Sequence, residues 1–531
     1  MSDPQLQTTL GVVGAGTMGA GIAQVGLTSG MHVVLYDPIP AALESAIERI
    51  ARGIERGKER ELWDADAGTL IGSQLVTSSE LASLAQCELV IEAAPEELPL
   101  KQALIRDLGA VLAADAVIAS NTSSIPITMI AAGAIDPAQV VGMHFFNPVP
   151  LMRLVEVIPA AQTSPETLAR ATNFGAALGK LVIAAPDSPG FLVNRCGRGF
   201  FGEALRLLQE RVAGVEQIDR ICRMAGAFRM GPFELMDLVG IDVNIAIAKS
   251  FAELSFGEPR WRPNPLQARM AASGSLGRKA GHGWYTYGEQ AHRDEDPVAP
   301  AAGGGEGRTL AVLGEGQLAA HLRARATGAG FSVAEEPSDR AIATVFADPD
   351  VRASALGDGP HPIVCCATSS LAFRRIPQAV GFNIPNHAAQ RALVELTCTP
   401  STPPATIRVA GEVFTGLGAH QEWVADAPGL VLERMLAQII NEAAFAYGEG
   451  VGTAEEIDTG VTVGLSYPRG PLAWGQLLGF ERVLATLDGI WQERREERYR
   501  PAPALIASAA QGEPATPGSS ARELAFVGQA A

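Results

Sequence analysis

The chain has 531 residues, 47% of them hydrophobic and 19% charged, so it can bury large cores and is not broadly disordered. Its net charge of −17 and the absence of a long Lys/Arg run argue against nucleic acid or an anionic membrane as a partner. Its six cysteines stand in no metal-binding spacing, so we expect no bound metal. With no secretory leader pattern and no stretch of 18 apolar residues, we expect a cytoplasmic protein of three or four domains.

The first third of the chain alternates strand and helix patterns. An apolar strand, TTLGVVGAG, leads through a tight glycine turn and a helix to a second strand, MHVVLYD. Residues 38–85 look helical and charged, and strand patterns return in LVIEAAPE (89–96), AVIASNTSS (116–124) and QVVGMHFFNP (139–148). This alternation is typical of a parallel, doubly wound α/β sheet. We therefore predict a Rossmann-type domain over residues 1–186.

From residue 187 the pattern becomes helical, as in PGFLVNRCGRGFFGEALRLLQE. We predict an all-helical domain over 187–290. Residues 291–308 are rich in Pro, Gly and Ala and lack apolar periodicity, which predicts a linker. Residues 501–531 are expected to form a loose tail.

The second half of the chain repeats the first. VGMHFFN (141–147) and VGFNIPN (380–386) are 239 positions apart, and the same offset pairs Glu156 with Glu395 and Asp187 with Asp426. The second glycine turn lies about sixty residues closer to its VGFNIPN segment, so the long charged helical stretch is missing. We predict a degenerate, shortened Rossmann-like domain over 309–425 and a second helical domain over 426–500. We expect the two helical domains to pack together within one chain.

The first glycine turn has the GxGxxG pattern between a strand and a helix. Its residues are Gly14, Gly16, Thr17, Met18 and Gly19. The first glycine allows the tight turn, the second lets the backbone approach a pyrophosphate, and the third lets the helix pack on the sheet. Asp37 follows the next strand, 18 residues after Gly19. A carboxylate at this position accepts hydrogen bonds from both ribose hydroxyls and repels a 2′-phosphate. The motif in this context predicts bound NAD.

A histidine and a glutamate on successive strands are candidates for acid–base chemistry. His144 lies at a strand end in GMHFFNP, and Glu156 lies in MRLVEVI. Alcohol oxidation needs a base for the hydroxyl proton, and a carboxylate on the second imidazole nitrogen fixes the tautomer. A lone histidine is more often structural, and Glu156 alone could be an ordinary strand acid. An unpaired carboxylate between two valines would be costly, however, which favours a paired role.

The second copy lacks the residues expected to bind a dinucleotide and to act as the base. Its turn, AVLGEG (311–316), places Glu315 where a pyrophosphate would lie, and Pro337 stands at the position of Asp37. His144 corresponds to Asn383, which cannot serve as a base. We expect a structural role for the second copy and no dinucleotide bound to it.

Seven motifs in the first half occur in the order of a known family: GAGTMG, IEAAPEE, ASNTSS, HFFNPVPLMRLVEVI, DSPGFLVNR, GPFELMDLVG and GRKAGHGWYTY. Together they resemble the 3-hydroxyacyl-CoA dehydrogenases over residues 8–290. Residues 426–480, with YPRGPLAWG, resemble the extra C-terminal domain of longer bacterial members, including those acting on 3-hydroxybutyryl-CoA or 3-hydroxyadipyl-CoA.

The resemblance implies reversible NAD-dependent oxidation of a 3-hydroxyacyl-CoA to the 3-oxoacyl-CoA, in fatty acid or phenylacetate degradation. His144 would be the general base and Glu156 its partner, and Ser123 and Asn194 would hydrogen-bond the substrate's oxygens. Ser123 could instead be a turn serine and Asn194 a helix-terminal asparagine. The positions implied to contact the dinucleotide are Glu96, Lys101, Asn147 and Lys279. Both lysines could equally be solvated surface residues.

The charged helical stretch carries a basic cluster of Arg52, Arg56, Lys58 and Arg60. In the family this region helps to hold coenzyme A, although a solvated helix face explains the cluster equally well. A dicarboxylic acyl chain would need a cation, for which Arg153 and Arg198 are candidates.

Three other functions compete with this assignment. A hydroxyacid dehydrogenase with a lysine base would lack the His144/Glu156 pair, and a non-catalytic NAD-binding scaffold would be expected to have lost His144. A dehydrogenase of hydroxy acids not attached to coenzyme A stays open, because a thioester leaves no sharp mark in a sequence. Single-copy relatives pair their helical domains between subunits, so a homo-oligomer also stays open.

Overall fold

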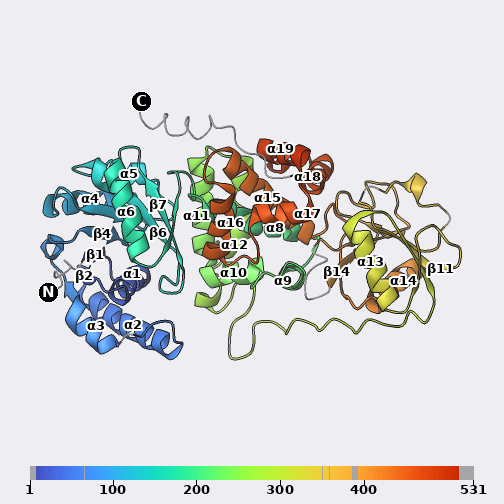
Figure 1. Ribbon diagram of the computed structural model, residues 1–531, viewed down its shortest axis with the longest axis horizontal. Helices are drawn as coiled ribbons and strands as arrows, with labels where there is room; N and C mark the ends of the chain where they lie inside the picture. Colours follow the sequence, from blue (N-terminus) through green and yellow to red (C-terminus); the bar gives the residue numbers. More distant parts are fainter. Residues whose placement is uncertain (1–7, 65, 350, 358, 386–392, 513–531) are drawn as a thin grey trace, which may run out of the picture. The chain divides into compact units, whose positions relative to one another are not determined.

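The computed structural model describes residues 8–64, 66–349, 351–357, 359–385 and 393–512 (Figure 1). These residues divide into two compact units. Residues 8–195 and 450–465 belong to the first, and the described residues of 196–449 and 466–512 belong to the second. No helix within the described ranges has both the length and the apolar character needed to cross a membrane.

The first unit contains an eight-stranded sheet in the order β3-β2-β1-β4-β5-β6-β7-β8. Its strands are β1 (Thr9–Val13), β2 (His32–Tyr36), β3 (Leu75–Ser78), β4 (Leu89–Glu92), β5 (Val117–Ser120), β6 (Val140–Phe145), β7 (Leu154–Pro159) and β8 (Leu181–Ala184). Its helices are α1 (Thr17–Thr28), α2 (Pro40–Glu59), α3 (Ala67–Gln74), α4 (Leu98–Val111), α5 (Ile127–Ala131), α6 (Pro165–Ala177) and α16 (Ala454–Leu465). The short α7 (Val193–Cys196) marks the passage to the second unit.

The predicted Rossmann-type sheet is confirmed, with two differences. The sheet is not wholly parallel, because β6 and β7 pair antiparallel. The connection from Phe145 to Leu154 is too short for the crossover that a parallel pair requires. Strand β3, a four-residue strand at the edge of the sheet, was also not predicted, because it lies within the stretch expected to be helical.

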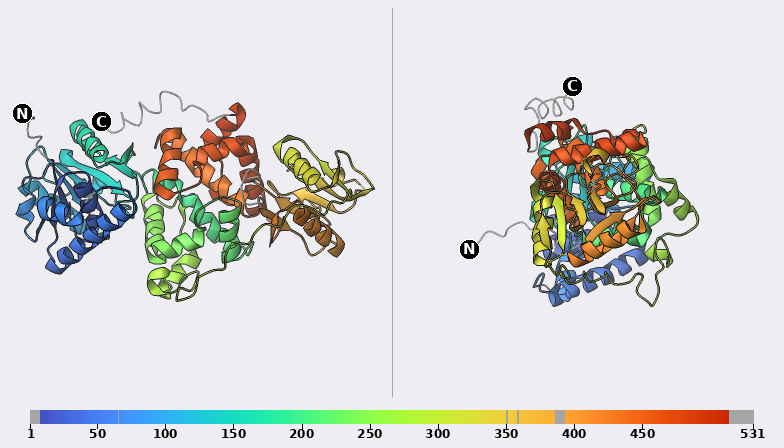
Figure 2. Two further views of the ribbon diagram at one scale, coloured as in Figure 1. Left: turned by 60° about the horizontal axis from the view of Figure 1, so that its bottom comes forward. Right: turned by 90° about the vertical axis from the view of Figure 1, so that its right-hand side faces the viewer.

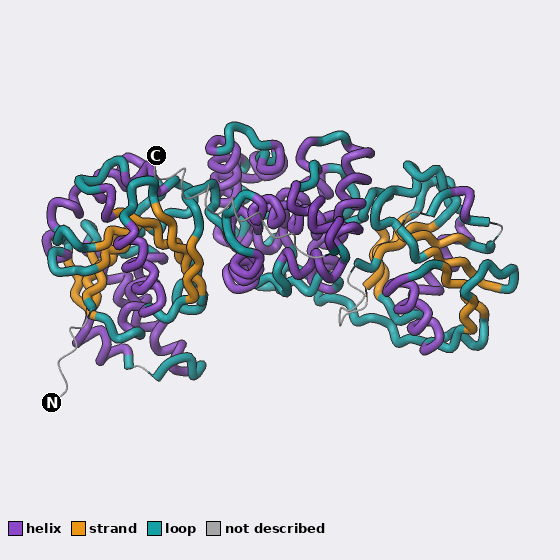
Figure 3. The backbone as a smooth tube through the Cα atoms, turned by 45° about the horizontal axis from the view of Figure 1, so that its top comes forward, coloured by secondary structure: helices purple, strands orange, loops and turns teal. Residues whose placement is uncertain are grey.

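Helices cover the strands of this sheet, as Figure 3 shows in purple and orange. Leu10 and Val12 of β1 pack with Ile22 of α1, Ile50 of α2 and Ala171 of α6 in one buried core. Strands buried in this way read as continuous apolar runs, which is why LGVV, VVL and LVI were recognisable in the sequence.

The second unit contains a seven-stranded sheet in the order β10-β9-β11-β12-β13-β14-β15 (Figure 1, yellow to orange). Its strands are β9 (Thr309–Leu313), β10 (Ser332–Ala334), β11 (Ala341–Phe346), β12 (Pro362–Cys365), β13 (Val380–Asn383), β14 (Leu393–Thr397) and β15 (His420–Val424). Helices α13 (Gly316–Gly328) and α14 (Pro404–Gly416) pack on it. Strands equivalent to β2, β1 and β4–β8 are present, and the equivalents of β3, α2 and α3 are absent from the described residues. The shortened repeat is therefore confirmed.

The rest of the second unit is helical. Its helices are α8 (Arg198–Gln209), α9 (Val215–Met224), α10 (Pro232–Val239), α11 (Ile241–Leu254), α12 (Pro265–Ala272), α15 (Leu432–Gly448), α17 (Pro471–Leu478), α18 (Phe480–Arg494) and α19 (Pro503–Gln511). The views in Figures 1 and 2 agree that α8 (green) and α15 (orange) lie side by side. Arg434 of α15 is fully buried and pairs with Glu203 and Glu210 of α8. The two helical segments pack together within one chain, as expected.

Two predicted boundaries are wrong. Part of the predicted tail is the ordered helix α19, which packs on α15 and α18 and buries Leu505 and Ala509; residues 513–531 lie outside the described residues. The predicted domain 426–500 is not one body either, because α16 belongs to the first unit. Neither point could be taken from local sequence, since both depend on contacts with distant segments.

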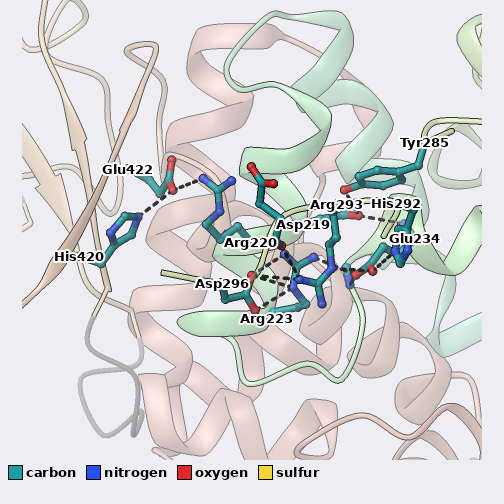
Figure 4. Close-up of polar contacts among 12 residues, drawn as sticks. Asp219, Arg220, Arg223, Glu234, Tyr285, His292, Arg293, Asp296, His420 and Glu422 are labelled. Atoms are coloured by element: carbon teal, nitrogen blue, oxygen red, sulfur yellow. Dashed lines mark hydrogen bonds and ion pairs between the residues drawn. The ribbon is translucent and has the colours of Figure 1, made fainter. Parts of the chain in front are cut away.

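The predicted linker, 291–308, has no helix or strand, as expected, but ion pairs fix it to the helices of its unit (Figure 4). The guanidinium of Arg223 contacts Asp296 at 2.6 Å. His292 and Arg293 contact Glu234 at 2.7 and 2.9 Å. This segment is therefore anchored rather than a free spacer.

Candidate active site

The glycine turn between β1 and α1 has the geometry that each glycine predicted. Gly14 has a φ of 101°, and a Cβ there would lie 2.8 Å from the carbonyl oxygen of Ala93. A Cβ on Gly19 would lie 1.7 Å from the Gly14 oxygen, so the helix could not pack as closely. A Cβ on Gly16 would meet no atom within 4 Å. The turn is tight on its inner side and open at Gly16, which is the shape that a pyrophosphate needs.

The carboxylate expected at the ribose lies beside this turn. Asp37 directly follows β2, and its Oδ2 accepts the Ala15 amide at 2.8 Å. Its Oδ1 accepts the amide of Ile39 at 2.9 Å. Helix α1 begins with Gly16 as its N-cap and has no side-chain cap, so its first amides are free to bind an anion. These residues fit a dinucleotide with an unphosphorylated ribose.

His144 and Glu156 face each other across β6 and β7. They are register partners in this antiparallel pair, and Nδ1 of His144 lies 2.7 Å from Oε2 of Glu156. The histidine is 5% exposed and the glutamate 0%, so the contact is shielded from water. The rings of Phe146 and Phe191 lie 4.6 and 5.6 Å from the imidazole centroid. The contact predicted from the sequence is confirmed, and it leaves Nε2 as the nitrogen available for chemistry.

The second oxygen of Glu156 is also engaged. Oε1 accepts the amides of Leu192 and Val193, each at 2.9 Å. These bonds fix the carboxylate, and through it the imidazole, to the loop that follows β8. Charge-assisted bonds of this kind are roughly twice as strong as neutral ones.

Helix α16 supports that loop from a distant part of the sequence. A Cβ on Gly460 would lie 2.9 Å from Leu192 and 3.2 Å from Val193, and a Cβ on Gly464 would lie 3.0 Å from Val193. The glycines therefore let α16 approach closely the two residues whose amides hold Glu156. Nothing in the first half of the sequence points to this contact.

Glu96 and Lys101 form a polar cluster with the turn after β5. Oε1 of Glu96 accepts the Ser123 amide at 3.0 Å and the Thr122 hydroxyl at 2.7 Å. Burial raises the pKa of Glu96, but Lys101 and these hydrogen bonds outweigh it, so its pKa is lowered. Lys101 is 1% exposed and lies 2.7 Å from Glu92. The alternative of a solvated surface lysine at position 101 is wrong, because its ammonium compensates two carboxylates.

The remaining predicted residues are more open. The Ser123 hydroxyl has no hydrogen-bond partner within the described ranges, so it is free to meet a ligand. Asn194 lies in α7 and is half-buried, and Asn147 is exposed after β6. Lys279 belongs to the second unit, where its ammonium pairs with Asp242 at 2.6 Å. The contacts of these residues with a dinucleotide or substrate stay predictions.

A cavity of about 390 Å³ lies between α1, α2 and the segment after β6. Its lining includes Arg56 and Arg60 of the predicted basic cluster. Arg52 and Lys58 do not line it, and Arg52 is exposed with Glu48 4.0 Å away.

Arg49, which was not predicted from the sequence, lines the same cavity and donates to the Ala15 oxygen at 2.6 Å. Its helical spacing from Arg56, two turns along α2, was the available signal. Arg49 thereby connects the glycine turn to the arginine-lined cavity.

In the second unit, the residues that correspond to His144 and Glu156 make different contacts. Asn383 and Glu395 are register partners on β13 and β14, and Glu395 accepts the amides of Val431 and Leu432. Arg482 makes a paired contact with Glu433 at 2.6 and 2.8 Å, and also reaches Asn383.

Glu433 stands where the first copy has Asn194. An arginine–glutamate pair with an amide thus replaces the imidazole and its open nitrogen. This arrangement supports the prediction of a structural second copy.

Comparison with known proteins agrees with the repeat. The 3-hydroxyacyl-CoA dehydrogenase NAD binding domain matches residues 9–188, and the C-terminal domain of the same family matches twice, at 190–287 and 429–517. A 3-hydroxyadipyl-CoA dehydrogenase of Escherichia coli (strain K12) is 34% identical over 93% of this chain and 95% of its own length.

Shorter relatives and a solved structure agree as well. A probable 3-hydroxybutyryl-CoA dehydrogenase of Deinococcus radiodurans is 41% identical over 52% of this chain and 99% of its own. The crystal structure of a 3-hydroxybutyryl-CoA dehydrogenase from Escherichia coli K12 has a TM-score of 0.80 and 32% identity, over 95% of this chain and 99% of that one. The chain therefore belongs to the 3-hydroxyacyl-CoA dehydrogenase family of NAD-dependent oxidoreductases acting on CH–OH groups.

Proposed function

We propose that the chain interconverts 3-hydroxyacyl-CoA and 3-oxoacyl-CoA, with His144 as the general base. Bound NAD supplies the hydride acceptor in this chemistry. Because Nδ1 of His144 faces Glu156, Nε2 carries the lone pair that takes the substrate's hydroxyl proton. Glu156 keeps the imidazole in this tautomer and stabilises its protonated form. The observation that carries the proposal is the 2.7 Å contact between these two buried side chains.

Orientation would come from the neighbouring polar groups. The free hydroxyl of Ser123 and the amide of Asn194 are the proposed partners of the substrate's oxygens. The glycine turn, Asp37 and the free amides of α1 would hold the dinucleotide. Proton transfer by a positioned side chain is typically worth about 10²–10⁴-fold, so positioning must supply much of the remaining acceleration.

Coenzyme A is proposed to bind at the cavity beside α2. Three arginines line it, Arg49, Arg56 and Arg60, next to Trp63 and residues 147–151. Arginine recognises phosphate in a bidentate manner, and the indole offers a surface for an aromatic ring. This composition suits a phosphorylated nucleotide carrier better than a free hydroxy acid.

The acyl group is proposed to be short, as in 3-hydroxybutyryl-CoA or 3-hydroxyadipyl-CoA, because the similar proteins described above are named for dehydrogenation of these compounds. Degradation of fatty acids or of aromatic acids is the proposed pathway class. A cytoplasmic location and homo-oligomerisation stay predictions from the sequence.

Steady-state assays of NADH oxidation test the proposal. We expect turnover with acetoacetyl-CoA and at least a hundredfold lower kcat/KM with free acetoacetate. Equal rates with the free acid would identify a dehydrogenase of free hydroxy acids. Tight NADH binding without turnover of acetoacetyl-CoA, 3-oxoadipyl-CoA or free acetoacetate would identify a non-catalytic protein.

A further inference from the structure

A second cavity, of about 490 Å³, lies wholly within the second unit. It is bounded by the start of α8 and by two 3₁₀ helices, η3 (Pro259–Trp261) and η6 (Glu497–Tyr499). Its lining contains six arginines: Arg198, Arg206, Arg260, Arg262, Arg495 and Arg498. Only two acids join them, Glu496 and Glu497. Guanidinium groups gathered in one cavity repel each other, and this cluster occurs in a chain whose net charge is −17.

Three of these arginines are neutralised by acids of the protein. Arg206 pairs with Glu496, which also lies 3.6 Å from Arg498. Arg260 contacts Glu442 at 2.8 Å. Because the charges of these three arginines are compensated, we expect them to stabilise the fold and not to bind an anion.

Arg198 is different, because no carboxylate of the described residues is paired with it. Its one hydrogen bond to the described residues, to the Asn244 oxygen, is long at 3.4 Å. Its guanidinium lies 5.3 Å from the ring centre of Phe251 and 6.0 Å from that of Phe201. Burial lowers the pKa of Arg198 to about 10, so the group stays charged at neutral pH in surroundings that solvate it poorly. An anion that reached it would offset this cost.

Two further uncompensated arginines extend the positive surface. Arg262 and Arg495 are exposed and line the same cavity, and neither is paired with a carboxylate of the described residues. The guanidinium of Arg495 instead stacks 4.5 Å from the Trp491 ring centre. Cations at the mouth of a cavity attract an anion and hold it loosely, whereas a buried cation binds it more firmly.

The walls of the cavity indicate what the anion is attached to. Phe201, Leu205, Trp261 and Pro263 line it beside the arginines. A bare phosphate would leave these surfaces without a partner, whereas a hydrocarbon chain would cover them. The volume lies within the range of about 300–1,000 Å³ that is typical of small-molecule sites.

We propose that this cavity binds a carboxylate carried on a short hydrocarbon chain. Arg198 makes the bidentate contact, and Arg262 and Arg495 attract the anion to the mouth. The ligand with this chemistry is a free, short dicarboxylic acid, and its binding is independent of the proposed function.

The test compares the full-length wild type with Arg198→Met, Arg198→Lys and Arg408→Met. Methionine keeps much of the aliphatic part of the side chain, and lysine keeps the charge but lacks the two parallel donors of a guanidinium group. Arg408 is an exposed arginine of α14 that does not line the cavity, so it serves as the control. Calorimetry measures the affinity of each protein for free adipate and for inorganic phosphate. The melting temperature of each variant reports folding.

We expect Arg198→Met to lower the adipate affinity at least tenfold, Arg198→Lys to lower it less, and Arg408→Met to leave it unchanged. The proposal is overturned if the adipate affinity is the same in Arg198→Met and wild type, or if phosphate binds as tightly as adipate. If Arg198→Met fails to fold, the same comparison is made with Arg262→Met, for which a threefold or larger effect is expected.

The outcomes also separate this proposal from the proposed function. A wild-type protein that binds adipate through Arg198 but oxidises no NADH with an acyl-CoA substrate would overturn the proposed function and support the adipate site. A protein that reduces acetoacetyl-CoA but binds adipate equally well with and without Arg198 would support the proposed function and overturn the adipate site.

Discussion

Glu395 lies directly opposite Asn383 on the antiparallel strands β13 and β14, in the register that Glu156 and His144 share on β6 and β7. The carboxyl group of Glu395 accepts the amides of Val431 and Leu432, and none of the described residues places a ring nitrogen beside it. Its contacts fix the start of the following helix. In the first unit, Glu156 both accepts two amides and contacts the imidazole of His144.

The pKa of Glu395 leads to a prediction about stability. Burial raises that pKa to about 8, whereas an unfolded glutamate titrates near 4.5. Between these values the folded state binds more protons than the unfolded state, so this residue makes the free energy of unfolding fall as pH rises. Glutamine cannot ionise. We expect Glu395→Gln to gain stability relative to wild type from pH 5 to pH 8, by at most about 1.4 kcal/mol per pH unit.

Chemical denaturation at several pH values measures this difference. Glu412→Gln, at an exposed position of α14, serves as the control and should show no such trend. A stability difference for Glu395→Gln that is constant from pH 5 to pH 8 would contradict the raised pKa.

The proposed base is tested by His144→Gln. Glutamine can occupy much of the space but cannot accept a proton near neutral pH, so we expect kcat to fall by about 10²–10⁴-fold. The affinity for NADH, followed by fluorescence, should change less than threefold, because the glycine turn and Asp37 are untouched. Asn383→Gln, the matching change in the second unit, should leave kcat near the wild-type value. Near-normal turnover in His144→Gln would end the proposed mechanism.

Two glycines of the turn should respond differently to the same substitution. Gly16→Val places its side chain in open space, so we expect a normal melting temperature and at least a tenfold loss of NADH affinity. Gly19→Val drives its Cβ into the Gly14 oxygen, so we expect a loss of stability of roughly 1–3 kcal/mol or more. Calorimetry of both variants with and without NADH measures each quantity. Equal NADH affinity in Gly16→Val and wild type would mean that the cofactor does not lie over this turn.

The support that α16 gives to the His144–Glu156 pair can be tested at Gly460. A valine there would overlap with Leu192 and Val193, so we expect a destabilisation of about 1–3 kcal/mol and a lower kcat even at temperatures where the protein stays folded. Gly72→Val on α3, where a Cβ meets no neighbour, controls for the cost of valine in a helix. If both variants lose stability equally and keep full kcat, α16 does not position Glu156.

Much of the fold, and the contact between His144 and Glu156, could be predicted because the signals are local. Strands buried on both faces appear as apolar runs, the GxGxxG turn has one physical purpose per glycine, and His144 and Glu156 lie at matching positions of successive strands. The repeat was visible because its offset is constant. These inferences needed no knowledge of long-range contacts.

The features that were missed depend on residues far apart in the chain. Lys101 reads as a surface lysine until Glu92 and Glu96 are found beside it. Asp296 reads as part of a polar linker until Arg223 is found to bind it. Helix α16 has an ordinary helical pattern, and only the packing of its glycines shows which unit it belongs to. Sequence patterns predict elements well and their partners poorly.

The membership of α16 in the first unit has a consequence for how the protein is made. Domains generally fold in order during synthesis, at about 5–20 residues per second, once their residues have left the ribosome. Here the loop that holds Glu156 is complete only after residues 450–465 have emerged, more than 250 positions after Val193. A nascent chain must therefore carry an unfinished first unit for about half of its translation, and a stop before residue 450 would leave that unit without the support of α16.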